Sequence, residues 1–453
     1  MYNSNNEQSI KNPLIIILLI GLMHLLLMWP GILSPDSQGQ YLMAIAGVYN
    51  DHHPPLMAFV WRYLDKIIPG PGMIFLLNLI LLYSSIFYLI NSIKSYRCRY
   101  LLLLFPLIPQ IVLYSSMIWK DIGFTFCFLF VASYLTYLTS NKHKPTWKQT
   151  TMLLIVLLYG TAIKFQAQYC APVLLGWMAY IWSNYKIYCK KFCTICGVLF
   201  VAFYLSLNSI NWILIPNVQK SHSWQLVKIY DLAAISLSIN QDLFPEFTKN
   251  KNFTMQELSK RLNHNPLDRF KYYMVDDLIF GDAILKSGVN QKERNELYFT
   301  WLNAVLKHPY AYLKHRSSNM ISMLLYHPTF KYINPLLTHN SALYFIINSL
   351  IYLTMSNLIP AILCFIYFVF GIYLLNKMRS LNWFAVPLVC FNAIGIIMML
   401  VLFFCSMAGT PRYTYITVCM VHASHVFAYL GFKSFRKQNA KSGTFSEQLI
   451  CSF

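Results

Sequence analysis

The sequence predicts an all-α polytopic membrane protein with about ten transmembrane helices and a small helical extracytoplasmic domain. Composition is the first reason. Hydrophobic residues make up 57% of the 453 residues and charged residues only 11%, a balance that soluble domains of this size do not show. Apolar runs of spanning length also recur along most of the chain, and one long polar segment interrupts them.

Ten apolar runs are long enough to be interpreted as spans, because roughly 20 apolar residues cross the hydrocarbon core of a bilayer. They occupy residues 13–30, 73–92, 100–117, 119–138, 150–164, 169–184, 192–211, 357–375, 383–405 and 412–431. The first run lacks a small-residue cleavage site, so we expect it to remain in the protein. Residues 341–356 are a candidate for a further embedded or re-entrant helix.

The polar segment divides the chain into three parts. We expect an N-terminal transmembrane module at residues 1–210, with a first outer loop at 31–72. An extracytoplasmic helical domain at 211–340 and a C-terminal transmembrane module at 341–453 follow. In the middle part, Thr254 and Glu257 have the spacing of a capping box, and His308-Pro309 is typical of a boundary between two helices.

The basic residues set the predicted orientation. The chain has 36 Lys and Arg against 16 Asp and Glu, a net charge of +20. If every apolar run spans once, the basic residues of the short loops share one side, which the positive-inside rule makes cytoplasmic. These residues are Lys11, Lys94, Arg97, Arg99, Lys142, Lys144, Lys148, Lys186, Lys190, Lys191, Lys377, Arg379, Lys433, Arg436, Lys437 and Lys441. Both termini are therefore predicted to be cytoplasmic. No nucleic-acid-binding signature accompanies the charge, so nucleic acid is not an expected partner.

The scarce acids beside the membrane are all predicted on the opposite, extracytoplasmic face. They are Asp36, Asp51, Asp65 and Asp121. The cations that break the positive-inside pattern fall on the same face. They are Arg62, Lys66, Lys120, Lys164 and Arg412. Charged groups next to hydrocarbon are costly and are usually functional, so both sets are candidates for a site. The cations need either an acidic partner or an anionic substrate.

Asp36 lies in the segment SPDSQGQYLMAIAGVYNDHHPP, residues 34–55, which follows the first apolar run. A carboxylate in a partly dehydrated loop is a candidate general base, because burial raises its pKa and makes it a better proton acceptor. The alternative is that Asp36 caps a helix that begins near Ser37.

The end of the same segment carries Asp51, His52 and His53 before two prolines. These residues are candidates for substrate contact, as a second acid with imidazoles that orient a donor or an acceptor. A metal half-site is a second interpretation, although it needs ligands from elsewhere. A turn closed by Pro54-Pro55 explains the prolines without either role.

Three cations are candidates for binding a phosphate. Arg412 follows a Gly-Thr-Pro turn at an outer helix end, and its planar fork suits a phosphate; snorkelling to lipid headgroups is the alternative. Lys120 either binds an anion or neutralises the adjacent Asp121. Lys164 precedes Gln166, which indicates either a binding site or a wet helix end. Asp121, Gln166 and Tyr413 complete the candidate substrate-binding set. Tyr230-Asp231 and residues 301–316 are interpreted as core of the middle domain, with an acceptor groove as the alternative.

Four motifs in this order resemble the GT-C superfamily of integral membrane glycosyltransferases. They are the acid of SPDSQGQY, His53-Pro54-Pro55, Trp119-Lys120-Asp121 and Pro411-Arg412-Tyr413. More narrowly, they are similar to bacterial members that use a polyprenyl-phosphate sugar. Those members include protein-mannosyltransferase-like enzymes and the serotype-converting glucosyltransferases that decorate O-antigen.

The resemblance implies an inverting hexosyltransferase of the bacterial inner membrane, with Asp36 as catalytic base. It implies a polyprenyl-phosphate sugar as donor, a glycan or lipid-linked acceptor, membrane lipids as surroundings, and Arg412, Lys120 and Lys164 around the donor phosphate. The chain has Asp36-Ser37 where the mannosyltransferase pattern has Asp-Glu. The second acid is therefore either missing or supplied by Asp51 or Asp121. We expect that no cofactor is required, and a divalent metal stays an alternative.

Two other functions remain open at this point. An O-antigen polymerase or ligase is also many-helical with a large outer loop, and it would depend on loop arginines and not on Asp36. A flippase or transporter of lipid-linked sugars would place polar groups at mid-membrane depth and show internal repeats.

Overall fold

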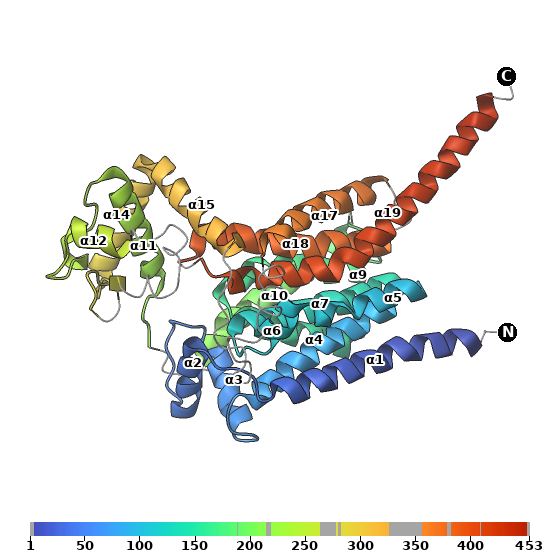
Figure 1. The fold of residues 1–453 in the computed structure, drawn as a ribbon, viewed down its shortest axis with the longest axis horizontal. Coiled ribbons are helices and arrows are strands. Elements are labelled where there is room, and N and C mark those ends of the chain that lie inside the picture. Colours follow the sequence, from blue (N-terminus) through green and yellow to red (C-terminus); the bar gives the residue numbers. More distant parts are fainter. Residues whose placement is uncertain are drawn as a thin grey trace, which may run out of the picture.

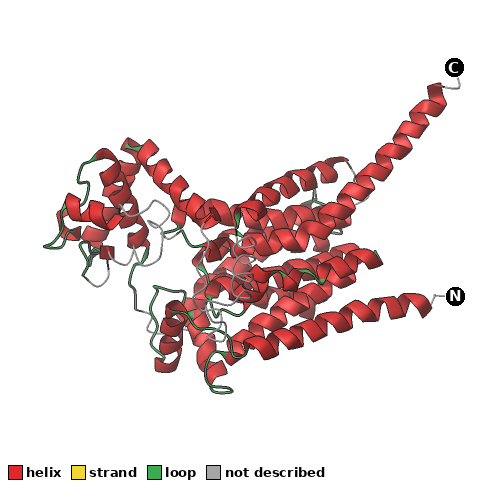
Figure 2. Cartoon of the chain, viewed as in Figure 1, coloured by secondary structure: helices red, strands yellow, loops and turns green. Residues whose placement is uncertain are grey.

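The structure is a computed structural model, and it describes residues 4–187, 189–213, 219–262, 278–279, 282–325, 356–377, 382–407 and 409–450. In these ranges it contains 17 α-helices, short 3₁₀ turns and a few isolated β-bridges. Long helices lie side by side in a bundle, and a smaller helical unit sits at one end (Figures 1 and 2). The prediction of an all-α protein is confirmed.

The first ten helices belong to the bundle and to its outer loop. They are α1 (Ser4–Met28), α2 (Pro35–Ala46), α3 (Leu56–Asp65), α4 (Gly72–Ser92), α5 (Tyr96–Leu102), α6 (Pro109–Ser115), α7 (Lys120–Asn141), α8 (Trp147–Ala162), α9 (Ala171–Trp182) and α10 (Lys190–Ile213). The 3₁₀ turns η1 (Phe105–Leu107) and η2 (Phe165–Tyr169) interrupt this series.

The remaining helices form the smaller unit and the end of the bundle. The α11–α15 unit consists of α11 (Trp224–Ile239), η3 (Glu246–Thr248), α12 (Met255–Leu262), α14 (Gln291–Lys307) and α15 (Pro309–Leu325). The bundle is completed by α17 (Leu358–Lys377), α18 (Asn382–Cys405), η5 (Pro411–Thr414) and α19 (Tyr415–Ile450). The possible helix at residues 341–356 lies, except for its last residue, outside the described part of the chain.

The prediction of ten spans is wrong, because the described residues contain six helices long and apolar enough to cross a membrane. These spans are Gly72–Ser92, Lys120–Asn141, Lys190–Ile210, Leu358–Lys377, Trp383–Cys405 and Pro411–Arg436. A seventh is counted if Arg97–Leu107 and Pro109–Ser115, which meet at 53°, form one broken span. Six or seven spans establish an α-helical protein with membrane-spanning helices, and they do not by themselves assign it to the GT-C fold.

Helix breaks explain the difference. Pro106 and Pro109 interrupt the run at 100–117, since proline removes a backbone donor and disfavours helix before it. The two runs between residues 150 and 184 become α8, with 16 residues, and α9, with 12, on either side of η2. At 1.5 Å per residue, these helices are about 24 Å and 18 Å long, shorter than a hydrocarbon core of about 30 Å. The apolar part of α1 is likewise short, from Pro13 to Met28.

Helix α7 is the centre of the bundle. In its most apolar window, 94% of the residues are buried inside the protein, whereas only 6% are buried in α10. Helices α4, α8, α9, α18 and α19 all contact α7. The position of α7 places Asp121 inside the protein rather than at a lipid-facing edge, and the adjacent Lys120 is half-buried.

The α11–α15 unit has its own apolar core, which includes Ile229, Leu258, Leu297 and Tyr312. The backbone N–H of Glu257 donates to the Thr254 hydroxyl at 3.0 Å, as the capping spacing predicts. Helix α14 ends at Lys307 with His308 as its C-cap, and Pro309 begins α15. These residues fall within the part of the chain predicted as a separate helical domain.

A buried ion pair links α11 and α15 inside this unit, and its arginine also bonds to the bundle. Arg316 Nη2 donates to Asp231 Oδ2 at 2.6 Å, and both side chains are fully buried. Arg316 Nη1 also donates to the Ser406 carbonyl at 2.6 Å, just after the end of α18. Trp301 Nε1 donates to the same Asp231 oxygen at 2.9 Å. Asp231 is therefore structural core, as the sequence interpretation favoured, and not part of an exposed acceptor groove.

We expect Asp231→Asn to lower the free energy of unfolding by about 3–5 kcal/mol, because it leaves the buried Arg316 charge unpaired. Asp242 is the matched control, since it pairs with Lys249 at a partly exposed site. Asp242→Asn should cost about 1 kcal/mol or less. Urea titration of the purified protein measures both, and equal losses would contradict the structural role of the Asp231 pair.

Both termini lie at the end of the bundle opposite the α11–α15 unit (Figure 1). The basic loops then predict that the unit is extracytoplasmic. Alkaline phosphatase fused after Lys307 should be active, and the same reporter fused after Lys144 should be inactive. The reverse pattern, in chains that insert at normal levels, would overturn the predicted orientation.

Candidate functional site

Five charged side chains from four separate segments of the chain meet at the end of the bundle nearest the α11–α15 unit. We call this cluster the charged centre. It consists of Asp36 from α2, Lys120 and Asp121 from α7, Lys164 from the link between α8 and η2, and Arg412 from η5. The structure thus brings the candidate base and the three candidate phosphate-binding residues to one place.

Arg412 connects two acids from different elements. Its Nη2 atom forms a hydrogen-bonded ion pair with Asp36 Oδ2, and each of these side chains is 12% exposed. Its Nε atom lies 3.9 Å from Asp121 Oδ2. The guanidinium therefore points to carboxylates inside the protein, and not to lipid headgroups as the snorkelling alternative requires.

Asp121 also pairs with Lys164 through Oδ1 and Nζ, and both of these side chains are only 2% exposed. Tyr413 lies in the same cluster, because Lys164 Nζ is 4.8 Å from the centroid of its ring. Asp121 thus lies between two cations, at the start of a helix whose dipole also favours negative charge. Lys120 does not simply neutralise the adjacent Asp121.

Lys120 contacts His53 instead. Its Nζ atom lies 2.6 Å from His53 Nδ1, and because an ammonium can only donate, Nδ1 must accept. Burial, and then the charge of Lys120, lower the pKa of His53 to about 3. The His53 ring is therefore neutral near pH 7, with its proton on Nε2. His52 stacks edge-on against it at 4.8 Å between ring centroids, and burial also lowers the pKa of His52.

The geometry of the first loop explains why Asp36 is free to pair with Arg412. Ser34, and not Asp36, caps α2, since its hydroxyl accepts from the Ser37 backbone N–H in a reciprocal capping box. Trp119 Nε1 donates to the same Ser34 hydroxyl at 2.7 Å. The bridge between Ile32 and Met117 also ties the loop to the start of α7. The helix-cap alternative for Asp36 is therefore wrong.

The ionisation of Asp36 differs from the expectation. Burial alone would raise its pKa, but the charge of Arg412, followed by smaller contributions from His53 and Lys120, holds the pKa below the ordinary value of 3.8. Asp36 is a stable carboxylate in this state, and a weak proton acceptor while Arg412 remains its partner.

Two buried amides that the sequence interpretation did not identify hold the turn that carries Arg412. Asn357 Nδ2 donates to the Pro411 carbonyl at 2.9 Å and lies 2.7 Å from the Thr414 hydroxyl. Gln110 Nε2 donates to Asn357 Oδ1 at 2.6 Å. The signal for both was a neutral amide within or beside an apolar run, where an unpaired polar group is costly.

Other predicted site residues lie apart from these ion pairs. Asp51 accepts hydrogen bonds from the Ser221 backbone N–H at 2.5 Å and from its hydroxyl, so Asp51 ties the first loop to the segment before α11. His52 Nδ1 lies 3.2 Å from the Ser223 hydroxyl at the same junction. Gln166 is half-buried in η2, and the described part of the chain offers its side chain no hydrogen bond.

The charged centre carries a surplus of positive charge. Three cations and two carboxylates give a net charge of +1, since His53 is neutral. Such a site can accept an anion without an additional cation. Among the described residues, no group of three or more His, Cys, Asp or Glu side chains is arranged to hold a metal ion.

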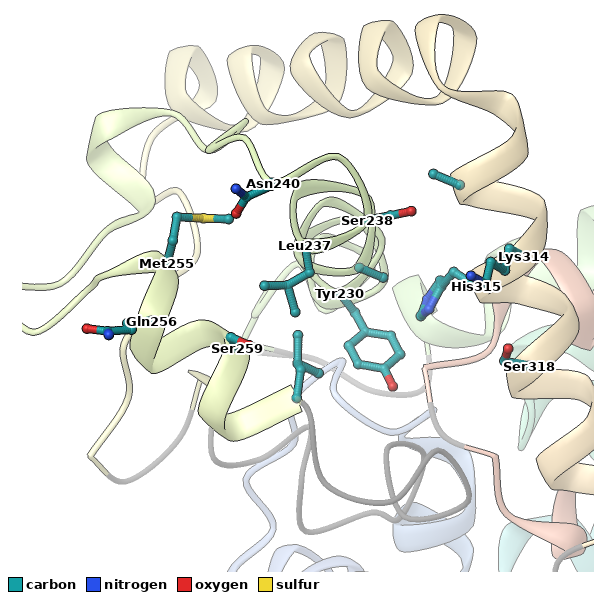
Figure 3. A pocket seen from close by; sticks show the side chains of 13 residues that line it. Tyr230, Leu237, Ser238, Asn240, Met255, Gln256, Ser259, Lys314, His315 and Ser318 are labelled. Atoms are coloured by element: carbon teal, nitrogen blue, oxygen red, sulfur yellow. The ribbon is translucent and has the colours of Figure 1, made fainter.

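A cavity of about 570 Å³ lies elsewhere, between α11, α12 and α15 (Figure 3). Tyr230, Leu237, Met255 and His315 are among its lining residues, together with Ser238, Asn240, Gln256 and Ser259. Its described lining residues include no carboxylate. The cavity belongs to the α11–α15 unit and contains none of the ion pairs of the charged centre.

Comparison of the chain with models of protein families, with curated proteins and with solved structures gives no match. The described residues form an α-helical protein with six or seven apolar helices of spanning length and a charged centre at one end of the bundle.

The pKa of His53 predicts a specific pH dependence. The unfolded chain takes up a proton near pH 6.5, and the folded protein does not do so until about pH 3, so this group lowers stability as pH falls between these values. His53→Gln keeps an acceptor for Lys120 and removes the titration. Its melting temperature should therefore fall less than that of the wild type between pH 7 and pH 4.

The exposed His143 is the control. His143→Gln should leave the pH dependence of melting unchanged. An equal fall in melting temperature between pH 7 and pH 4 for the wild type and His53→Gln would contradict the neutral, buried imidazole.

Proposed function

We propose that the chain is a glycosyltransferase of the GT-C type. It moves a hexose, with inversion, from a polyprenyl-phosphate carrier to a hydroxyl group of a cell-envelope glycan such as O-antigen. The observation that supports this proposal is the convergence of Asp36 with Arg412, Lys164 and Lys120, which combines a candidate base with a surplus of cations. Transfer from a lipid phosphate needs both kinds of group.

The cations hold the phosphate of the donor. The Arg412 fork suits two phosphate oxygens, and Lys164 and Lys120 add positive charge nearby. Because Arg412 already pairs with Asp36, the phosphate must compete with that carboxylate for the guanidinium. When Arg412 turns to the phosphate, Asp36 loses its main stabilising charge, and burial then raises its pKa towards the range useful for a base.

In the reaction, Asp36 accepts the proton of the acceptor hydroxyl. The hydroxyl oxygen forms a bond to the anomeric carbon, and the bond from that carbon to the phosphate oxygen breaks. The electron pair of the broken bond stays on the phosphate, which leaves as polyprenyl phosphate. Its added negative charge is stabilised by the cations of the charged centre. One displacement of this kind inverts the anomeric configuration.

The remaining candidates surround this reaction. The neutral His53 ring and Tyr413 can hydrogen-bond to sugar hydroxyls, and Asp121 orients Arg412 and Lys164. We propose that Asp51, His52 and Gln166 contact the substrate at the edge of the site. No cofactor is needed for these steps, and a bound divalent metal would add to the charge that already faces the phosphate.

A lipid-linked sugar transporter is the second candidate, because polar side chains pair inside the bundle. Tyr367 OH lies 2.9 Å from His425 Nδ1, and His425 Nε2 lies 3.1 Å from His422 Nδ1. His24 similarly lies between Tyr83 and Ser115. Such groups within membrane helices mark pathways in some transporters. A transporter would move its substrate without any change in glycosidic bonds.

We expect Asp36→Asn to reduce hexose transfer by about 10²–10⁴-fold, since it removes the base and keeps the shape of the side chain. The assay is transfer of labelled hexose from a polyprenyl-phosphate donor, together with mass spectrometry of the envelope glycan. Asp65→Asn is the matched control from the same loop, because Asp65 bonds only to Tyr41 and the Gly70 N–H among its described contacts.

Full transfer by correctly inserted Asp36→Asn protein would rule out the proposed base and favour a polymerase or ligase that depends on Arg412. Unchanged glycosidic linkages in cells with and without the wild-type chain would favour the transporter.

A further inference from the structure

The side-chain oxygen of Gln40 is buried without a hydrogen-bond partner. The Gln40 side chain is 2% exposed, and its Oε1 atom is buried and accepts no hydrogen bond. Leaving a buried amide oxygen unpaired costs free energy, so such a group in a folded protein needs a specific explanation.

Its position in α2 places Gln40 beside the candidate base. Asp36 and Gln40 are four residues apart, and residues with this spacing are neighbours on one face of a helix. Gln40, Ser37 and Ala44 form the buried face of α2, whereas Leu42 is 66% exposed on the other side. Gln40 therefore lies one helical turn beyond the carboxylate that pairs with Arg412.

Two further buried atoms near the same ion pair have no partner. Arg412 Nε makes no hydrogen bond, since Asp121 Oδ2 is 3.9 Å away, and the Thr410 hydroxyl two residues earlier is also unpaired. The turn that carries them is otherwise well satisfied, because Asn357 contacts both the Pro411 carbonyl and the Thr414 hydroxyl. The unused hydrogen-bonding capacity is thus at the charged centre, where a substrate would supply the partners.

We propose that Gln40 is a specificity-determining residue that binds hydroxyl groups of the transferred sugar ring. This inference rests on the proposed transferase function and adds a role that the charged residues cannot fill. A side-chain amide is neutral and both donates and accepts, which suits a sugar hydroxyl, itself both a donor and an acceptor. A phosphate offers only acceptors and negative charge, which suit the cations Arg412 and Lys164 better than a neutral amide.

The test uses the full-length protein in nanodiscs and the variant Gln40→Met, which keeps the length of the side chain and removes its polar atoms. Three ligands are compared: a short-chain polyprenyl-phosphate hexose, its monodeoxy analogues, and the same lipid phosphate without sugar. Gln38→Met is the matched control, because Gln38 is exposed on the same helix.

For Gln40→Met we expect binding of the complete hexose donor to weaken by about 10-fold to 100-fold, which is typical for the loss of hydrogen bonds to a substrate hydroxyl. Binding of the bare lipid phosphate should be unchanged. The analogue that lacks the partner hydroxyl should bind the wild type and the variant equally. Without ligand, Gln40→Met should melt at the same temperature as the wild type or higher, because it removes a buried oxygen that has no hydrogen-bond partner.

A purely structural Gln40 gives a different result. It would lower the melting temperature of the ligand-free variant or weaken binding of all three ligands by the same factor, and either outcome overturns the inference. Equal affinity of the wild type for the hexose donor and the bare phosphate would also overturn it, and would leave the proposed transferase standing if hexose is still transferred. Absence of transfer from any hexose donor would instead overturn the proposed function, and the binding and melting data would still decide the role of Gln40.

Discussion

The pairing of Arg412 with Asp36 and Asp121 is the interaction on which the arrangement of this protein depends. Asp36 and Arg412 are 376 positions apart in the chain, and their ion pair joins the first outer loop to the turn before the last helix. Asp121 adds the start of the central helix α7. Charged groups beside a bilayer are costly unless they are paired, so these three elements stabilise one another where they meet.

Hydrogen bonds to backbone carbonyl groups also hold the turn that carries Arg412 in position. Between α18 and α19 the chain leaves regular helix, and its carbonyl groups need partners in surroundings with little water. Arg316 and Asn319 donate to the Ser406 carbonyl on one side of the turn. Asn357 donates to the Pro411 carbonyl on the other side. The α11–α15 unit, through Arg316, thus helps to define where the guanidinium of Arg412 points.

Sequence patterns predicted the helical class and the charged centre because charge is scarce in this chain. Asp36, Arg412 and Lys164 stood out as ionisable groups at the ends of apolar runs, and shared sidedness predicted that they meet. The number of spans was wrong because hydropathy does not register breaks such as the one at η2. Neutral amides such as Asn357 and Gln40 give a weaker signal than charged groups, since only the fold shows which of them are buried and what they contact.

The same pairing gives the proposed transferase a means of coupling its base to its donor. A free Asp36 beside the membrane would be a reactive, poorly solvated carboxylate, and a free Arg412 would be an unpaired buried cation. In the proposed reaction, Asp36 and Arg412 stabilise each other until the phosphate of the donor binds to the guanidinium. In that reaction, proton abstraction by Asp36 then becomes favourable only when the lipid-phosphate sugar is bound, so that the base becomes active together with its donor. The ion pair that stabilises the fold is therefore also the pair that the proposed reaction must open.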